Sequence, residues 1–364
     1  MTARPDHRRD AREAGATLIE MLVAALITCV LLGVLLQLAV IAQHSTRTQM
    51  DVADLQQRLR VAIDRINSDL VMAGAGPSGG AWNQGLVNAV APLVPGRTGS
   101  SGADAELSYH ADRLSILYVP DPSLQTAISI DMGAAGAPVV IDPTAPGCVP
   151  SGDCGFSPGD RALVFDPSEP EGSYDIFTVS ATVGGQLLPA SALSKAYAAG
   201  SLVMRVVQHV YHLDRVANRL MLYDGESSDL PLVDHVVDLR VSYFAEPSAA
   251  SVPPPPAGRS NCAYASGEPP VPLLQDLGGT VLKVLTPGQL SDGPICGVAP
   301  HRFDADLLRV RRVRVILRLE AAAAELRGTG SRFVRSGTSS DGLRYVPDQQ
   351  VVLDVAPRSL NLAR

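Results

Sequence analysis

The chain has 364 residues, of which 46% are hydrophobic, and a formal net charge of −7 at pH 7. This length allows one large domain, or two small ones, beside a membrane anchor. An acidic chain without a basic tract disfavours nucleic-acid binding as the main role, because that binding depends on neutralising phosphates. The 32 glycines and 28 prolines are numerous for a helical protein and favour a loop-rich β domain.

An apolar run begins near the N-terminus. Residues 15–41 contain one charged side chain, Glu20, close to the start of the run. As a helix that rises about 1.5 Å per residue, about 26 residues reach roughly 39 Å, enough to cross a hydrocarbon core of about 30 Å. Arginines concentrate before the run, which predicts a single span with a cytoplasmic N-terminus and a translocated remainder. A carboxylate in lipid is costly, so Glu20 is a functional candidate.

The polar-to-apolar junction falls at Gly15, and the run is longer than the apolar region of about 7–15 residues in a secretory signal. Gly15 followed by Thr17-Leu18-Ile19-Glu20 resembles the class III signal of type IV prepilins. The resemblance implies that residues 1–15 are a leader peptide, cut after Gly15 by a prepilin peptidase that then N-methylates Ala16. Ala16 stands where this family usually has Phe. The alternative is an ordinary membrane anchor whose Glu20 lies near the lipid headgroups.

The helix is expected to continue beyond the span, because the chain has no Pro or Gly from residue 42 to residue 73. Apolar residues recur there at steps of three and four, which places them on one helix face. This stripe is Val52, Leu55, Leu59, Ala62, Ile63, Ile66 and Leu70. The pattern predicts one helix from about residue 16 to about residue 73, with a membrane-spanning half at 16–41 and an amphipathic half at 42–75. Gly74-Ala75-Gly76-Pro77 ends it.

Strand signals then follow in series, separated by turns and not by helices. The expected strands are Leu114–Val119, Ala127–Ile130, Val139–Ile141, Ala162–Phe165, Ile176–Val183, Leu202–Leu213, Arg219–Tyr223, Val233–Phe244, Val310–Leu319 and Gln350–Val355. Such an order predicts a mostly antiparallel sheet whose apolar face packs against the helix stripe. The fold class is therefore α+β, with residues 76–364 as a β-rich domain outside the cytoplasm and a loop insertion at about 245–306.

The chain has five cysteines, and Cys29 lies in the apolar run. The other four would reach an oxidising compartment, where disulfides are favoured. Our first choice pairs Cys148 with Cys154 and Cys262 with Cys296, although four cysteines allow three pairings. A zinc site is the alternative, but no C-x-x-C spacing or neighbouring His pair supports it.

The sequence indicates neither an enzyme nor a metal or cofactor site. It lacks a P-loop and H-E-x-x-H. His209 and His212 are three apart on an expected strand, so they point to opposite faces. Oxygen-rich loops bind Ca²⁺, and one loop is acidic, but a solvated loop is the simpler interpretation. Its acidic residues are Asp166, Glu169, Glu171 and Asp175.

Four further segments widen the resemblance to minor pilins of the PilW type. They are Asp69–Gly74 at the helix end, Val233–Tyr243, Leu308–Val315 and Val351–Leu362. Within the first, Val71 replaces the family's usual arginine. Residues 81–200 are largely outside the resemblance.

The resemblance implies a structural role in priming or capping a type IV pilus, in which Glu20 pairs with the Ala16 amine of a neighbouring subunit. It implies an inner-membrane location and then the pilus, with major and minor pilins, the peptidase and an adhesin as partners. The alternatives are a J-type minor pseudopilin of type II secretion and a membrane-tethered hydrolase or ligand-binding domain. The arginines at 309, 311, 312 and 314 are weak support for DNA binding, because alternating arginines are more often the wet face of a strand.

Overall fold

The computed structural model describes residues 17–76, 86–88, 90–121, 124–145, 148, 152–166, 173–246, 262, 281–339 and 345–361. The chain divides into two compact units, Met1–Asp54 and Leu55–Arg364. An N-terminal helix and strands in antiparallel sheets make this an α+β fold, as the sequence predicts.

Helix α1 runs from Leu18 to Met72, within two residues of the predicted bounds at each end. It ends because Gly74 adopts a φ of 71°, in the left-handed region that favours glycine. A side chain at Gly74 would also collide with Val87, since an added Cβ would lie 2.6 Å from its Cγ1. Gly74 therefore lets the chain turn closely out of the helix and towards β1.

A five-stranded sheet receives the second half of α1. Its order is β1 (Leu93–Val94), β2 (Arg113–Tyr118), β9 (Val207–Asp214), β10 (Arg219–Tyr223) and β11 (Asp229–Asp234). The helix stripe is buried, as expected, at Leu55, Leu59, Ala62, Ile66 and Leu70. Hydrogen bonds join α1 to β2, β9 and the end of β11, so the helix crosses this sheet.

A four-stranded sheet has the order β13 (Lys283–Val284), β12 (Val236–Ala245), β16 (Val310–Leu319) and β17 (Gln349–Val355). It joins the first sheet where Val241 in β12 donates a 2.7 Å hydrogen bond to the carbonyl oxygen of Ala111. β12 and β16 are hydrogen-bonded neighbours, so residues 246–309 form an excursion between them. That excursion contains β13 and the two-stranded pair β14 (Ile295–Cys296) and β15 (Phe303–Asp304). Helix α2 (Arg358–Asn361) follows β17.

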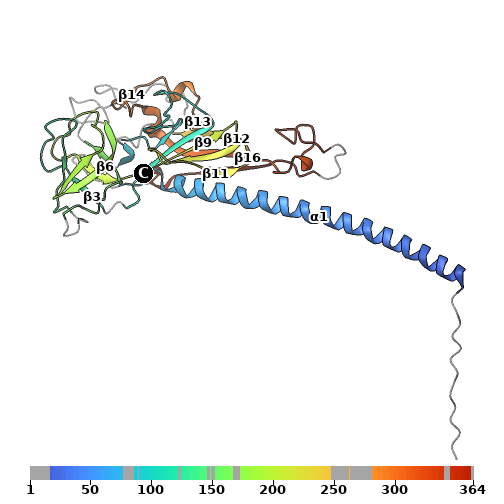
Figure 1. The fold of residues 1–364 in the computed structure, drawn as a ribbon. Coiled ribbons are helices and arrows are strands. Elements are labelled where there is room, and N and C mark those ends of the chain that lie inside the picture. Colours follow the sequence, from blue (N-terminus) through green and yellow to red (C-terminus); the bar gives the residue numbers. More distant parts are fainter. Residues whose placement is uncertain are drawn as a thin grey trace, which may run out of the picture. The chain divides into compact units, whose positions relative to one another are not determined.

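A six-stranded sheet is inserted between β2 and β9, which are themselves neighbours. Its order is β3 (Gln125–Ala127), β8 (Leu202–Arg205), β5 (Arg161–Phe165), β6 (Tyr174–Val183), β7 (Gln186–Pro189) and β4 (Val139–Val140). In Figure 1, β3 and β6 lie to one side of β9, β12 and β16. The insert has its own apolar core, which includes Ile128, Val139, Ile141, Phe156, Ala162, Val164, Phe177, Val179, Leu187, Tyr197 and Val203. Every strand pairing among the described residues is antiparallel.

Two segments expected as single strands are each divided. Residues 202–213 form β8 and β9, because Val206 marks the point where the chain leaves the six-stranded sheet for the five-stranded one. Residues 233–244 contain the end of β11 and most of β12, because His235 adopts a φ of 61° that breaks the extended backbone. Hydrophobic patterning marks the strands in both cases but not the change of sheet.

Candidate functional site

The first half of α1 is an apolar helix without a covering surface. Leu18–Val40 is long and apolar enough to cross a membrane, by length and composition alone, a test that a signal sequence also passes. Its large hydrophobic side chains are all exposed in the unit that contains them. Exposed apolar area of this size is unfavourable in water, so the segment requires lipid or another protein surface around it.

Glu20 forms a capping box with Thr17 at the start of this helix. The Thr17 backbone N–H donates to Glu20 Oε2 over 2.9 Å, and the Thr17 hydroxyl donates to the same oxygen over 3.1 Å. The Glu20 N–H in turn lies 3.3 Å from Thr17 Oγ1. In the single chain, the carboxylate therefore satisfies the helix N-terminus. The predicted cleavage residues Gly15 and Ala16 lie outside the described residues.

A buried charge cluster holds the other half of α1 on the sheet. Asp69 is only 2% exposed, yet it lies on the same helix face as the apolar stripe. Its carboxylate is 2.8 Å from His209 Nδ1 and accepts a 2.5 Å hydrogen bond from the Tyr211 hydroxyl. Tyr118 donates to its other oxygen over 3.2 Å, and Arg65 Nε lies 3.7 Å away. Side chains from two strands, β2 and β9, thus contact one carboxylate of the helix.

The electrostatics of this cluster keep Asp69 ionised. Burial raises the pKa of its carboxyl, but the hydrogen bonds from His209 and Tyr211 and the charges of His209 and Arg65 outweigh burial, so the pKa falls below its usual value. Burial and the nearby carboxylate together raise the pKa of Tyr118 to about 12. The two tyrosines therefore stay protonated as donors to a carboxylate at neutral pH.

The two histidines on β9 point to opposite faces, as their spacing predicts. His209 contacts Asp69 on the helix side. His212 Nε2 lies 3.0 Å from Asp229 Oδ1 and 3.2 Å from Arg97 Nη1 on the other side. The two histidines therefore contact different side chains and have no partner in common.

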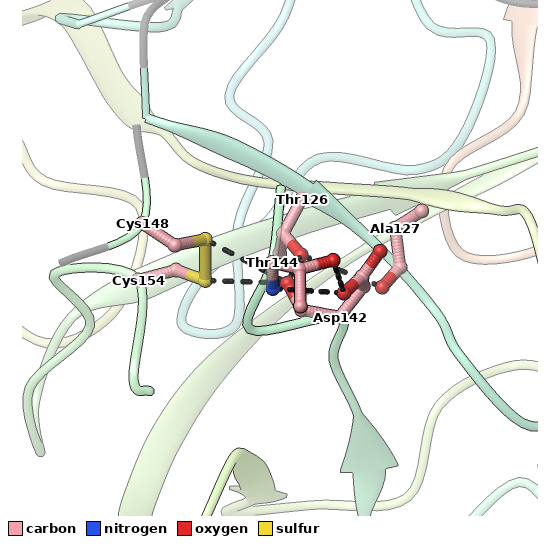
Figure 2. Close-up of a disulfide and its surroundings, with 6 residues drawn as sticks. All are labelled: Thr126, Ala127, Asp142, Thr144, Cys148 and Cys154. Atoms are coloured by element: carbon pink, nitrogen blue, oxygen red, sulfur yellow. Dashed lines mark hydrogen bonds between the residues drawn. A yellow bond between two sulfur atoms is a disulfide. The ribbon is translucent and has the colours of Figure 1, made fainter. Parts of the chain in front are cut away.

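The structure joins the four cysteines of the domain as Cys148–Cys154 and Cys262–Cys296, the first choice among the three pairings. Figure 2 shows the former beside Asp142, whose carbonyl oxygen lies 3.7 and 3.6 Å from the two sulfur atoms. The Thr126 hydroxyl donates to that same carbonyl oxygen over 2.7 Å. This disulfide thus closes the loop between Cys148 and Cys154, next to a carbonyl group that is hydrogen-bonded to the edge strand β3. Cys29 is a free thiol in the apolar helix.

A hollow of about 110 Å³ lies between residues 94–108 and residues 290–307. Charged side chains on its wall are paired with other protein groups. Arg97 donates to Asp229 over 2.8 Å, Asp104 accepts from the Arg97 N–H over 2.7 Å and from Arg113, and Arg302 donates to Glu106 over 2.6 Å. The hollow is smaller than ligand pockets of about 300–1,000 Å³, so it offers little support for the tethered hydrolase or ligand-binding alternative.

The arginines at the start of β16 correct one expectation. Arg309 and Arg311 are buried, not on a wet strand face. Arg314 is half-exposed and forms a two-pronged pair with Asp354, with both N–O distances 2.9 Å. This segment therefore lacks a row of open cations for nucleic acid.

The acidic loop is only partly described. Glu169 and Glu171 lie outside the described residues, and Asp175 accepts hydrogen bonds from Ser194 and from the Tyr197 hydroxyl. Asp175 thus serves packing in the six-stranded sheet. The structure does not bring the four predicted acidic side chains together in its described part.

No protein-family model, curated protein or solved structure matches this chain. Functional inference therefore rests on the geometry of the chain itself. Sequence patterning singles out Glu20 but misses the role of Asp69, although an acid between Ile66 and Leu70 in an apolar stripe is a signal for a buried polar contact.

Proposed function

We propose that this chain is a minor pilin that primes or caps assembly of a type IV pilus. One observation carries the proposal: a single helix of 55 residues is apolar on all sides at one end and one-sided at the other. The one-sided end is buried on a β-sheet. A helix of this kind suits a subunit that is stored in a bilayer and then transferred into a filament core, because both environments cover its apolar half.

In this proposal, a peptidase removes residues 1–15 and the new Ala16 amine is methylated. Glu20 of one subunit then pairs with the Ala16 ammonium of its neighbour. The carboxylate exchanges its contacts with Thr17 for an opposite charge. In a low-dielectric filament core this pair offsets two charges that are costly alone, so it sets the register between adjacent helices.

The β domain would lie outside the filament core and contact other pilins or an adhesin. β11 and β17 are edge strands of their sheets, and each exposes an apolar side chain, Leu230 and Val352 respectively. Edge strands with free backbone groups are suited to contacts with other chains. The role is structural and not catalytic.

A J-type minor pseudopilin of type II secretion is the second candidate, because the same helix and sheet would serve it equally. The two differ in partners. Crosslinking in cells, followed by identification of the subunit attached to the helix, separates a pilus from a secretion pseudopilus.

Glu20→Gln tests the assembly step. We expect the variant to insert into the membrane at the wild-type level but to be depleted at least about tenfold from sheared filaments, which corresponds to a lost pairing of about 1.4 kcal/mol or more. The measurement is the ratio of filament-associated to membrane-associated chain by immunoblot. Asp64→Asn, which removes an exposed acid from the same helix, is the matched control. Equal incorporation of Glu20→Gln and wild type would show that the pairing is not used.

A further inference from the structure

Three aspartates converge in the excursion between β12 and β16. Asp292 follows a short 3-10 turn, Asp304 ends β15, and Asp306 lies in the 3-10 turn that leads into β16. One carboxylate oxygen from each lies within 4.8 Å of the other two. Three like charges at this separation repel one another strongly unless a cation lies between them.

Two of the three carboxylates are withdrawn from solvent. Asp304 is 1% exposed and Asp306 is 0% exposed, whereas Asp292 is open to solvent. Asp304 is held in place by hydrogen bonds from the Gly293 N–H at 2.7 Å and the Asp306 N–H at 2.9 Å. Neither carboxylate oxygen of Asp306 accepts a hydrogen bond within the described part of the chain. A buried carboxylate of this kind carries a large desolvation cost, and such groups are normally paired or bound to a metal.

The charge balance of the cluster fits a divalent cation. In the described part of the chain, Arg309 is the positive group that faces it, and its Nε lies 3.9 Å from Asp306 Oδ1, an ion-pair distance that is too long for a hydrogen bond. Three ionised aspartates and one guanidinium leave a charge of −2.

We propose that Asp292, Asp304 and Asp306 form a Ca²⁺ site. The donors are all carboxylate oxygens, which hard cations prefer, and the three side chains include neither the histidine nor the cysteine that zinc prefers. Exposed Asp292 provides the entry path. Ca²⁺ fits better than Mg²⁺ because irregular turns tolerate its flexible coordination, whereas Mg²⁺ demands near-octahedral geometry.

The ion would fasten the excursion to the four-stranded sheet. The residues that carry Asp306 continue without a break into Val310 of β16, and Asp304 pairs with Ile295 in β14, next to the disulfide residue Cys296. Binding to the folded state alone raises the stability of that state. The inference does not depend on the proposed function.

The test uses the full chain, purified in detergent and stripped with a chelator. Bound metal is measured after equilibrium dialysis against 1 to 5 mM CaCl₂, a range taken from the affinities of about 10⁻⁴–10⁻³ M of extracellular Ca²⁺ modules. We expect about one Ca²⁺ per chain and a midpoint of thermal unfolding raised by at least about 2 °C. MgCl₂ at the same concentration should give a smaller shift.

Asp306→Asn and Asp292→Asn should each abolish the Ca²⁺-dependent shift, and Asp354→Asn, an equal charge change on β17, should retain it. Asp292 is exposed, so its variant keeps the test valid even if Asp306→Asn fails to fold. The proposal is overturned if stripped wild type takes up no Ca²⁺, if the two site variants respond like wild type, or if Mg²⁺ gives an equal shift.

Discussion

At the scale of single residues, Asp69 decides how α1 meets the sheet. Its carboxylate is buried with an imidazole and two phenols around it, and these donors come from two strands. A buried charge is expensive when its partners are removed, because the remaining group keeps its desolvation cost. The cluster therefore specifies the position of the helix as well as stabilising it.

Asp69→Asn should lower the free energy of unfolding at pH 7 by about 1–3 kcal/mol, the usual cost of leaving buried donors without a carboxylate acceptor. The folded-state pKa of Asp69 is lowered, so its contribution is present above the unfolded pKa of about 3.9 and is lost as the pH falls through the folded value. Chemical unfolding followed by circular dichroism at pH 7 and at about pH 3 measures both effects.

The matched control is Asp64→Asn, on an exposed position of the same helix, which should change stability by less than about 0.5 kcal/mol. The difference between Asp69→Asn and wild type should shrink on acidification. A difference that is constant with pH would mean that the carboxylate charge is not what stabilises the contact.

At the scale of elements, the burial of one stripe of α1 accounts for the packing of its second half. Ile66→Ala should destabilise the chain by about 2–5 kcal/mol, because Ile66 is 1% exposed and its loss leaves a cavity under the helix. Val61→Ala, on the opposite face at 45% exposure, should cost less than about 0.5 kcal/mol. If the two variants lost the same free energy of unfolding in denaturant titrations, the helix would have to pack on the sheet through a different face.

The elements also show how far local patterning reaches. The helix, its stripe and the strand Val310–Leu319 could be predicted because each follows one periodicity over many residues. The division at Val206 could not, because that residue is apolar and buried, as a residue inside a continuous strand would be, and only the partner strand changes. The cluster of Asp292, Asp304 and Asp306 arises from tight turns whose course no periodic pattern specifies.

At the scale of the whole molecule, two neighbouring sheets, which meet at β12, form the part of the β domain that packs with α1, and two excursions leave them. One excursion is the six-stranded sheet between β2 and β9, and the other lies between β12 and β16. The first covers most of residues 81–200, for which the likeness to minor pilins expected from sequence offers no guidance. Each excursion carries a disulfide, which constrains residues that the main sheets do not pair.

The proposed function concerns the other end of the chain, where the apolar half of α1 would move from a bilayer into a filament. In that proposal, the new amine at Ala16 pairs with Glu20 of a neighbouring subunit. Intact-mass and N-terminal peptide spectrometry of the chain, isolated from cells with and without a prepilin peptidase, tests it most directly. The account predicts a chain that starts at Ala16 with one added methyl group when the peptidase is present and at Met1 when it is absent. A chain that still starts at Met1 in the presence of the peptidase would contradict it.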